Sequence, residues 1–207
     1  MIRAARGAGF ILVLAGIMVL GLIAFGYWHS GATARHDRQA FTQELQRELG
    51  HPPLSAGLAA CSLREPEAGK PFAFIRIPRL GQNWRLPVIQ GTGEAQLNTG
   101  AVGHVAGTGM PGNGNLSLAA HVVSAGNPFL HLSSLRRGDT VTVTDRCGSY
   151  TYRVTWQRVV GEHDVGVLDS VPGKRVITLI TCHPAVYWST PDRLIVRGVL
   201  ESGPLIR

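Results

Sequence analysis

The sequence has few clustered charges and no grouping of side chains that predicts a metal or nucleic-acid site. Its 20 basic and 13 acidic residues give a formal charge of +7 at neutral pH. The basic residues are scattered, without the Lys/Arg runs and interleaved aromatic residues typical of nucleic-acid binding. Glu162, Asp164 and Asp169 are too sparse to indicate a calcium site. We therefore expect no nucleic-acid partner and no obligatory metal or cofactor.

Internal repeats and low-complexity tracts are also lacking, and the length suits one domain of ordinary size with an appendage. The excess of basic residues would suit an anionic wall polymer or lipid headgroups. Because these residues are scattered, a mildly basic soluble surface is the simpler interpretation.

Charge is absent from residues 8–28, the one long apolar run. A helix needs roughly 20 apolar residues to cross the hydrocarbon core of a bilayer. Tyr27 and Trp28 end the run at a position suited to lipid headgroups, and Arg3 and Arg6 precede it. The positive-inside rule then predicts a single-pass protein of the cell membrane, with a cytoplasmic N-terminus and the rest of the chain outside.

A cleaved signal peptide is the alternative interpretation of this run. The apolar core of a signal peptide is usually about 7–15 residues long and ends in small residues. Phe25-Gly26-Tyr27-Trp28 is a poor cleavage site, and the run is longer than such a core. We therefore expect residues 1–28 to be a cytoplasmic stub and an uncleaved anchor.

Residues 29–70 are predicted to form a stalk. Apolar residues recur every four positions between His36 and Gly50, which indicates a short amphipathic helix. Pro, Gly, Ala and charged residues follow, a composition typical of a flexible linker. Such a spacer would let the next domain, residues 71–207, reach substrates above the bilayer.

Residues 71–207 have the pattern of an all-β domain with many short strands. Val141 and Val143 alternate with threonines, and Tyr150 and Tyr152 begin a second alternating segment. Strands are predicted at 72–78, 84–90, 116–121, 140–144, 150–157, 176–182 and 193–200. Gly-rich turns separate several of them, and no long helical periodicity occurs, so we expect a closed barrel or a sandwich.

Cysteine is scarce, with only Cys61, Cys147 and Cys182 in the chain. Outside the membrane, an odd number leaves at least one thiol without a disulfide partner. A Cys61–Cys147 disulfide would leave Cys182 free, although the sequence does not establish that pairing. Cys182 ends an apolar β-branched segment just before Pro184, where it could face a cleft. Its position alone fits a buried core cysteine better.

A reactive cysteine needs a nearby base or cation to stabilise its thiolate. His183 is adjacent to Cys182, but successive residues of a strand point to opposite faces. His121 is the better partner, because it closes a predicted strand and small Ala120 before it leaves room for a substrate backbone. A hydrogen-bonded core histidine is the alternative for His121.

Arg193 and Arg197 share one face of the last predicted strand. Burying a charge inside a small barrel is unfavourable unless it is paired or faces a site, and a solvated outward face is equally compatible with the pattern. A fixed guanidinium is able to stabilise the oxyanion that forms during acyl transfer.

Together these residues resemble the sortase family of cysteine transpeptidases. Thr-Leu-Ile-Thr-Cys at Thr178–Cys182 is similar to the family's Thr-Leu-x-Thr-Cys signature. Arg193 lies in Asp-Arg-Leu-Ile-Val-Arg, which resembles the arginine-bearing last strand. His121, with Gly114-Asn115 shortly before it, completes the family's His…Cys…Arg order. The likeness covers about residues 71–200.

Several further segments resemble class E sortases. They are Ile77–Gly81, Val88–Thr92, Asn127–His131, Leu135–Asp139, Thr151–Thr155 and Cys182–Pro184. The flanks of the histidine differ, because Ala120 and Val122 stand where relatives usually have Gly and Arg. The Asp-Pro-aromatic lid motif of class C enzymes is missing, since the linker has Glu65-Pro66-Glu67 instead, so an open site is expected.

The resemblance implies an eight-stranded β-barrel with short helices and a two-step transfer. It implies that Cys182 attacks the Thr carbonyl of a Leu-Pro/Ala-x-Thr-Gly-like sorting signal, carried at the C-terminus of secreted proteins. His121 would move protons, Arg193 would stabilise the oxyanion, and an amine of a peptidoglycan precursor would receive the peptide. The implied substrate-binding residues are Ala120, Thr181, Tyr187 and Trp188.

Three other functions were weighed. An L,D-transpeptidase is disfavoured because its Ser-His-Gly-Cys neighbourhood does not surround Cys182. A thiol hydrolase would release the peptide to water rather than to an amine. A catalytically silent, membrane-tethered barrel would only bind wall peptides, and the changes at Ala120 and Val122 keep this alternative open.

Overall fold

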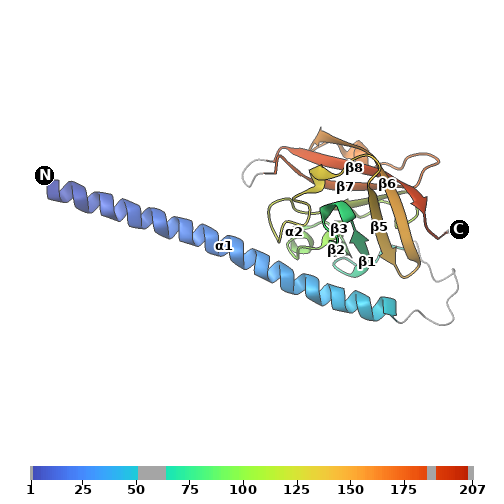
Figure 1. The fold of residues 1–207 in the computed structure, drawn as a ribbon, viewed down its shortest axis with the longest axis horizontal. Coiled ribbons are helices and arrows are strands. Elements are labelled where there is room, and N and C mark those ends of the chain that lie inside the picture. Colours follow the sequence, from blue (N-terminus) through green and yellow to red (C-terminus); the bar gives the residue numbers. More distant parts are fainter. Residues whose placement is uncertain (1, 51–63, 186–189, 205–207) are drawn as a thin grey trace.

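The computed structural model describes residues 2–50, 64–185 and 190–204, which form one long helix and one closed barrel (Figure 1). The helix, α1, spans Ile2–Gly50. The strands are β1 (Pro71–Arg76), β2 (Arg85–Gln90), β3 (Val102–His104), β4 (Asn115–Ala119), β5 (Thr140–Asp145), β6 (Gly148–Gly161), β7 (Val176–His183) and β8 (Asp192–Ser202). Short helices connect them at α2 (Glu94–Leu97), η2 (Pro78–Leu80), η3 (Leu132–Ser134) and η4 (Val165–Leu168).

The strands close in the order β1-β2-β3-β4-β7-β8-β6-β5, which confirms the predicted eight-stranded barrel. Two neighbouring pairs, β2–β3 and β4–β7, are parallel, and the other pairs are antiparallel. Strand β3 was not predicted, because three residues are too few to show an alternating pattern. It nevertheless joins β2 to β4 and so closes the barrel next to the predicted histidine.

Side-chain alternation separates the barrel interior from its outer surface. Leu116 and Leu118 on β4, Ile177 and Leu179 on β7, and Leu194 and Val196 on β8 all belong to one buried core cluster. Burial of a large aliphatic side chain contributes roughly 1.5–3 kcal/mol. Since successive residues point to opposite faces, the intervening residues of the same three strands face outward.

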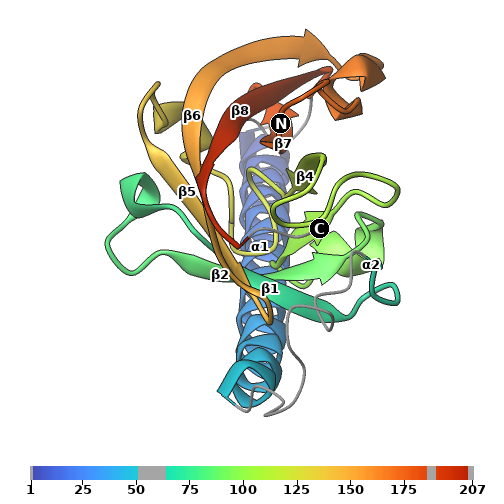
Figure 2. The ribbon, with the colours of Figure 1, turned by 90° about the vertical axis from the view of Figure 1, so that its right-hand side faces the viewer.

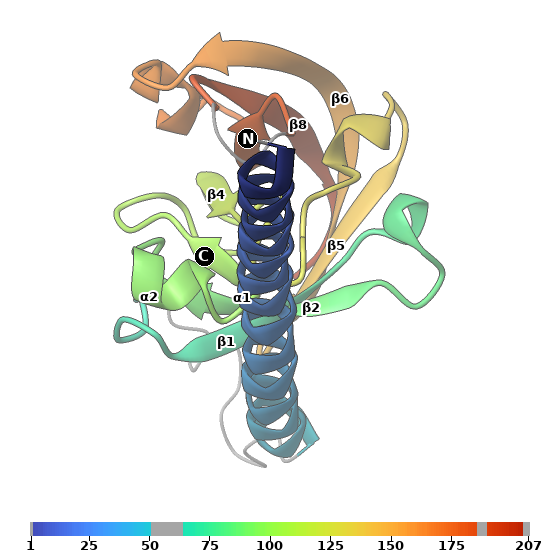
Figure 3. The ribbon, with the colours of Figure 1, turned by 90° about the vertical axis from the view of Figure 1, so that its left-hand side faces the viewer.

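Helix α1 is continuous where two separate elements, an anchor and a short helix, were predicted. Its C-terminal half runs beside β1 and β2, as Figures 2 and 3 show from opposite sides. Ala34 and Leu45 in this half of the helix are fully buried. The N-terminal half extends away from the barrel (Figure 1), and large apolar side chains between Val13 and Trp28 are exposed. In the described chain, α1 is one helix that is long and apolar enough to cross a membrane.

Candidate active site

The backbone register brings the predicted histidine, cysteine and arginine to neighbouring positions at the ends of three adjacent strands, with His121 two residues beyond the end of β4. Cys182 on β7 lies directly opposite Arg193 on β8. On the other side, β4 and β7 run parallel with Ala119 beside Ile180. Extending that register by two residues sets His121 beside Cys182. The three residues therefore form a row at one end of β4, β7 and β8, which we call the catalytic row.

The catalytic row faces the outside of the barrel. Ala120 and Leu194 are inward members of the core cluster, so their neighbours His121 and Arg193 point outward. Cys182 has the same parity, and its side chain is half-buried rather than enclosed in the core. Arg193 and Arg197 both belong to the outer face, but both are half-buried and hydrogen-bonded rather than fully solvated.

His121 is held by a neighbour that the sequence did not indicate. Its Nε2 lies 3.1 Å from Oδ1 of Asn98, at the end of α2. An amide oxygen only accepts hydrogen bonds, so Nε2 carries the proton in this arrangement and Nδ1 is left as the basic nitrogen. Burial lowers the pKa of His121, and the charge of Glu94 opposes this effect. The ring therefore favours its neutral form.

The bond to Asn98 also means that the His121 ring is oriented by Asn98 rather than by the Cys182 thiol. Among the described residues, no hydrogen bond joins the His121 ring to the Cys182 thiol, so proton exchange between them requires a small movement of the ring. Catalytic hydrogen bonds are often long or absent without substrate and tighten only when it binds. Backbone hydrogen bonds limit that movement, because the Ala120 N–H donates to the Ile180 carbonyl oxygen and the His121 carbonyl oxygen accepts from the Phe129 N–H.

Arg193 is fixed at the start of β8 by three acceptors. Its Nη1 donates to the carbonyl oxygens of Thr190 at 2.7 Å and Asp192 at 2.9 Å. Its Nη2 lies 3.2 Å from Oε2 of Glu162, just after β6. A guanidinium has five N–H donors, so this arrangement leaves two for a substrate. Glu162 was considered in the sequence only as a weak metal ligand, and its role beside Arg193 depends on the β6–β8 pairing.

The threonine before the cysteine ties the two catalytic strands together. The hydroxyl of Thr181 donates to the carbonyl oxygen of Ala120 at 2.8 Å, next to His121. Thr181 and Ala120 are buried, with 3% and 4% of their surface exposed. Their predicted contact with substrate stays a prediction. Val122 is also buried, so an apolar side chain packs where relatives usually have an arginine.

Two further predictions concern segments outside the described residues. Tyr187 and Trp188, expected to line the substrate groove, are among residues 186–189, and Cys61 of the expected Cys61–Cys147 disulfide is among residues 51–63. Within the described residues, no group of three His, Cys, Asp or Glu side chains is arranged to hold a metal ion.

Arg197 has a different environment from Arg193. Its Nε donates to Oγ1 of Thr178 at 3.2 Å, and its Nη2 bonds to the carbonyl oxygen of Val167 in η4. Asn115 donates to the same carbonyl oxygen and accepts a bond from Thr178. Burial lowers the pKa of Arg197, and nearby Arg158 adds to this effect. These bonds attach the β6–β7 connection to the barrel.

Comparison with known proteins agrees with this arrangement. A model of the sortase domain matches residues 75–201. Sortase SrtE1 of Streptomyces coelicolor is 29% identical over 217 residues, covering 97% of this chain and 58% of the relative. Sortase A of Streptococcus agalactiae is 34% identical over 132 residues, covering 61% of this chain and 51% of the relative. The chain thus spans little more than half the length of these curated relatives.

Solved structures give the same result. Sortase E from Streptomyces avermitilis has a TM-score of 0.60 and 39% identity, and covers 66% of this chain and 91% of its own. Sortase E1 from Streptomyces coelicolor, solved with a tripeptide in its active site, has a TM-score of 0.59 and 32% identity, covering 66% and 92%. The barrel, the catalytic row and these relatives lead to one conclusion: the chain belongs to the sortase family and resembles its class E members.

Proposed function

We propose that this protein is a membrane-anchored transpeptidase that cleaves a Leu-Pro/Ala-x-Thr-Gly-like sorting signal between Thr and Gly. It then transfers the new C-terminus to an amine of a peptidoglycan precursor. The observation that carries the proposal is the catalytic row, in which a thiol, an imidazole and a guanidinium occupy adjacent positions on three strands. Few structural roles require all three groups at one exposed strand end.

In the first step, Sγ of Cys182 attacks the carbonyl carbon of the signal's threonine. The thiol proton passes to His121, which delivers it to the departing glycine nitrogen as the C–N bond breaks. The products are a thioester on Cys182 and a peptide with a free amine. The neutral ring, with Nδ1 as its basic nitrogen, suits the first half of this proton transfer.

In the second step, an acceptor amine attacks the thioester carbonyl. His121 takes a proton from the attacking nitrogen and returns it to the sulfur as the C–S bond breaks, which restores the resting enzyme. Both steps pass through an oxyanion on the same carbonyl. The two free donors of Arg193 would stabilise this charge, and Glu162 together with two carbonyl oxygens keeps the guanidinium in place.

The membrane anchor suggests how the site would be oriented relative to the bilayer. Residues 8–28 would cross the membrane, with Arg3 and Arg6 on the cytoplasmic side. Strand β8 begins on the side of the barrel toward which the N-terminal half of α1 extends (Figure 1). This orientation supports a site that faces the outer surface of the bilayer, where a lipid-linked precursor and a membrane-retained sorting signal would both be found.

The proposal is tested with a fluorescent sorting peptide and a diglycine-like amine, followed by mass spectrometry of the products. We expect a ligated product with the wild-type protein, and neither product nor thioester with Cys182→Ala. Continued transfer by this variant would refute the assignment. Release of the free peptide acid with amine in excess would identify a thiol hydrolase, and binding without cleavage would identify a silent peptide-binding barrel.

A further inference from the structure

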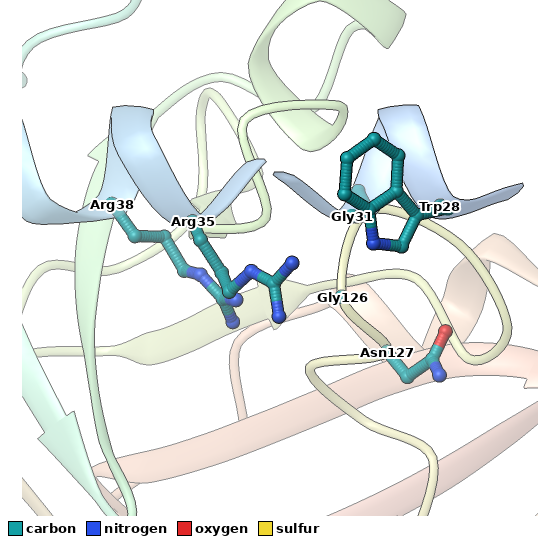
Figure 4. A pocket seen from close by; sticks show the side chains of 7 residues that line it. Trp28, Gly31, Arg35, Arg38, Gly126 and Asn127 are labelled. Atoms are coloured by element: carbon teal, nitrogen blue, oxygen red, sulfur yellow. The ribbon is translucent and has the colours of Figure 1, made fainter. Parts of the chain in front are cut away.

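A cavity of about 280 Å³ lies between α1 and the loop that follows His121, apart from the catalytic row. Figure 4 shows Trp28, Gly31, Arg35 and Arg38 from the helix around it, with Gly126 and Asn127 from the loop. The mechanism proposed above uses none of these residues. The cavity therefore needs a separate explanation.

In the described part of the chain, the two arginines of this cavity form no ion pair, and Asp37, which lies between them in the sequence, pairs with His36. None of the ion pairs among the described residues includes Arg35 or Arg38. Arg38 is half-buried, and a Cβ placed on Gly126 would lie 2.6 Å from its Nη2, so the guanidinium lies directly against the loop. Burial lowers the pKa of Arg38, and the charge of Arg35 lowers it further. A partly desolvated guanidinium beside a second positive charge, with no ion-pair partner, is unfavourable unless an anion joins them.

A third arginine extends the same positive region. Two further cavities lie against α1 and β2, and both include Arg38 and Arg85. The Arg85 guanidinium lies 3.5 Å from the centre of the Phe74 ring, which covers one of its faces and leaves its edge donors for a ligand. No Asp or Glu lines any of these three cavities. Three of the 20 basic residues, which look scattered in the sequence, are thus gathered along one side of α1.

The position along the helix indicates which anion would reach this region. Trp28 is exposed and ends the apolar run, at the level expected for lipid headgroups. At 1.5 Å per residue, Arg35 and Arg38 follow it by about 10–15 Å along the axis. Helical side chains lean toward the N-terminus, and arginines extend toward the membrane interface, which shortens this distance. Both guanidinium groups point from α1 toward the loop in Figure 4.

We propose that the cavity between Trp28, Arg35, Arg38 and Gly126 binds the phosphate or pyrophosphate group of a membrane lipid. Phosphate oxygens would accept hydrogen bonds from the paired guanidinium groups, and the lipid's apolar part would extend past Trp28. Bound in this way, the lipid fastens α1 to the loop next to His121 and holds the barrel against the bilayer. The inference rests on the membrane anchoring in the proposed function.

The test uses the full chain in a neutral detergent, with lipid adducts detected by native mass spectrometry and stability followed by thermal unfolding. Phosphatidylglycerol is titrated against phosphatidylcholine with the same acyl chains, and inorganic pyrophosphate is titrated separately. We expect a one-to-one phosphatidylglycerol adduct and a raised Tm, with weaker phosphatidylcholine binding. If inorganic pyrophosphate alone raised the Tm as much as phosphatidylglycerol, the phosphate group would be sufficient for binding. If pyrophosphate did not raise the Tm, the acyl chains would also be needed.

The decisive variant is Arg35→Gln/Arg38→Gln. We expect it to bind phosphatidylglycerol at least about tenfold more weakly, because each charged hydrogen bond lost corresponds to roughly that factor. Arg47→Gln, on the same helix but outside all three cavities, is the matched control and should bind like wild type. Arg35→Gln alone changes an exposed residue and keeps the test valid if the double variant fails to fold.

Two outcomes would overturn the inference: unchanged phosphatidylglycerol binding by the arginine variants, or an equal loss with Arg47→Gln. Cys182→Ala separates this result from the proposed function. It should bind lipid normally while failing to transfer peptide. Conversely, the double arginine variant should keep its transfer activity toward a soluble peptide and amine in detergent.

Discussion

The two ends of the β7–β8 ladder have similar residues in different environments. At one end, Thr178 lies opposite Arg197, and both join a closed network with Asn115 and the Val167 carbonyl group. At the other end, Cys182 lies opposite Arg193. There the thiol has no hydrogen bond among the described residues, and the arginine keeps two free donors.

This difference separates a structural arginine from one available for chemistry. A closed polar network stabilises the fold, because each buried group already has its partner. An incomplete one leaves donors for a substrate, and the backbone ladder, rather than side-chain contacts, holds its groups in register. Substitutions at the two ends should therefore affect different properties. Changes near Arg197 should lower the free energy of unfolding, and changes near Cys182 should lower the rate of peptide transfer.

After Cys182→Ala, the largest effect is expected from His121→Ala. Loss of the acid/base group should lower the rate of peptide transfer about 10²–10⁴-fold, with little change in Tm. His183→Ala is the matched control, because His183 is adjacent to Cys182 in sequence but has the opposite strand parity. Comparable rate losses in the two variants, measured by single-turnover thioester formation, would contradict the pairing inferred from the β4–β7 register.

The two arginines of β8 give the next largest contrast. Arg193→Ala should lower the transfer rate about 10²–10³-fold, as expected for loss of an oxyanion donor, while leaving the fold intact. Arg197→Ala should lower the free energy of unfolding by about 1–3 kcal/mol, since it leaves a part-buried carbonyl group with fewer partners. Urea unfolding and transfer kinetics on both variants measure these two effects. Equal losses of transfer rate would show that the two arginines do not differ in function.

The sequence predicts features that depend on neighbouring residues, but not those that depend on contacts between residues far apart in the chain. The alternation around Ile177 and Leu194 predicts β7 and β8, because period-two burial is a local pattern. The three residues of the catalytic row were predicted differently, from the resemblance of their His…Cys…Arg order to that of sortases, and their catalytic roles stay predictions. Asn98 and Glu162 were not found as partners, because they reach His121 and Arg193 only through strand pairings distant in sequence.

The helix shows the same limit. Its apolar run predicts a membrane span, and the spacing between His36 and Gly50 predicts helix, yet neither predicts that the two are continuous. The burial of Ala34 depends on the loop at Ala125 and Gly126, whose approach to α1 no local pattern records.

A smaller effect should distinguish the two threonines of the Thr-Leu-Ile-Thr-Cys signature. Thr178→Val and Thr181→Val each remove a buried hydroxyl donor and should lower the free energy of unfolding by about 1–3 kcal/mol. Only Thr181→Val should also slow transfer, because its bond to the Ala120 carbonyl group fixes the backbone next to His121. Equal activity of the two variants, corrected for the folded fraction, would show that this bond does not position the histidine.

The smallest expected effect concerns a histidine in another buried polar network. His104 is fully buried, with Nδ1 2.7 Å from Oε1 of Gln90 and Nε2 3.0 Å from the carbonyl oxygen of Gly109. The Gln90 amide is oriented by donating to Glu65, so its oxygen accepts from Nδ1, and the neutral ring then has no proton on Nε2 to donate to the Gly109 carbonyl oxygen. Burial lowers the pKa of His104 below its ordinary value of 6.5, against smaller opposing effects from the Gly109 bond and the charge of Glu65.

This lowered pKa gives stability a pH dependence of known sign. Below pH 6.5 the unfolded chain binds a proton that folded His104 resists, so its contribution is complete above 6.5 and decreases as the pH falls toward the folded value. His104→Gln should therefore show a shallower decline of Tm between neutral and mildly acidic pH, with some slope remaining from His121. His131→Gln, at an exposed position, should decline like wild type. If Tm declined with pH as steeply in His104→Gln as in the wild type, the folded protein would accommodate the proton on His104, and this ring would not contribute to the pH dependence of stability.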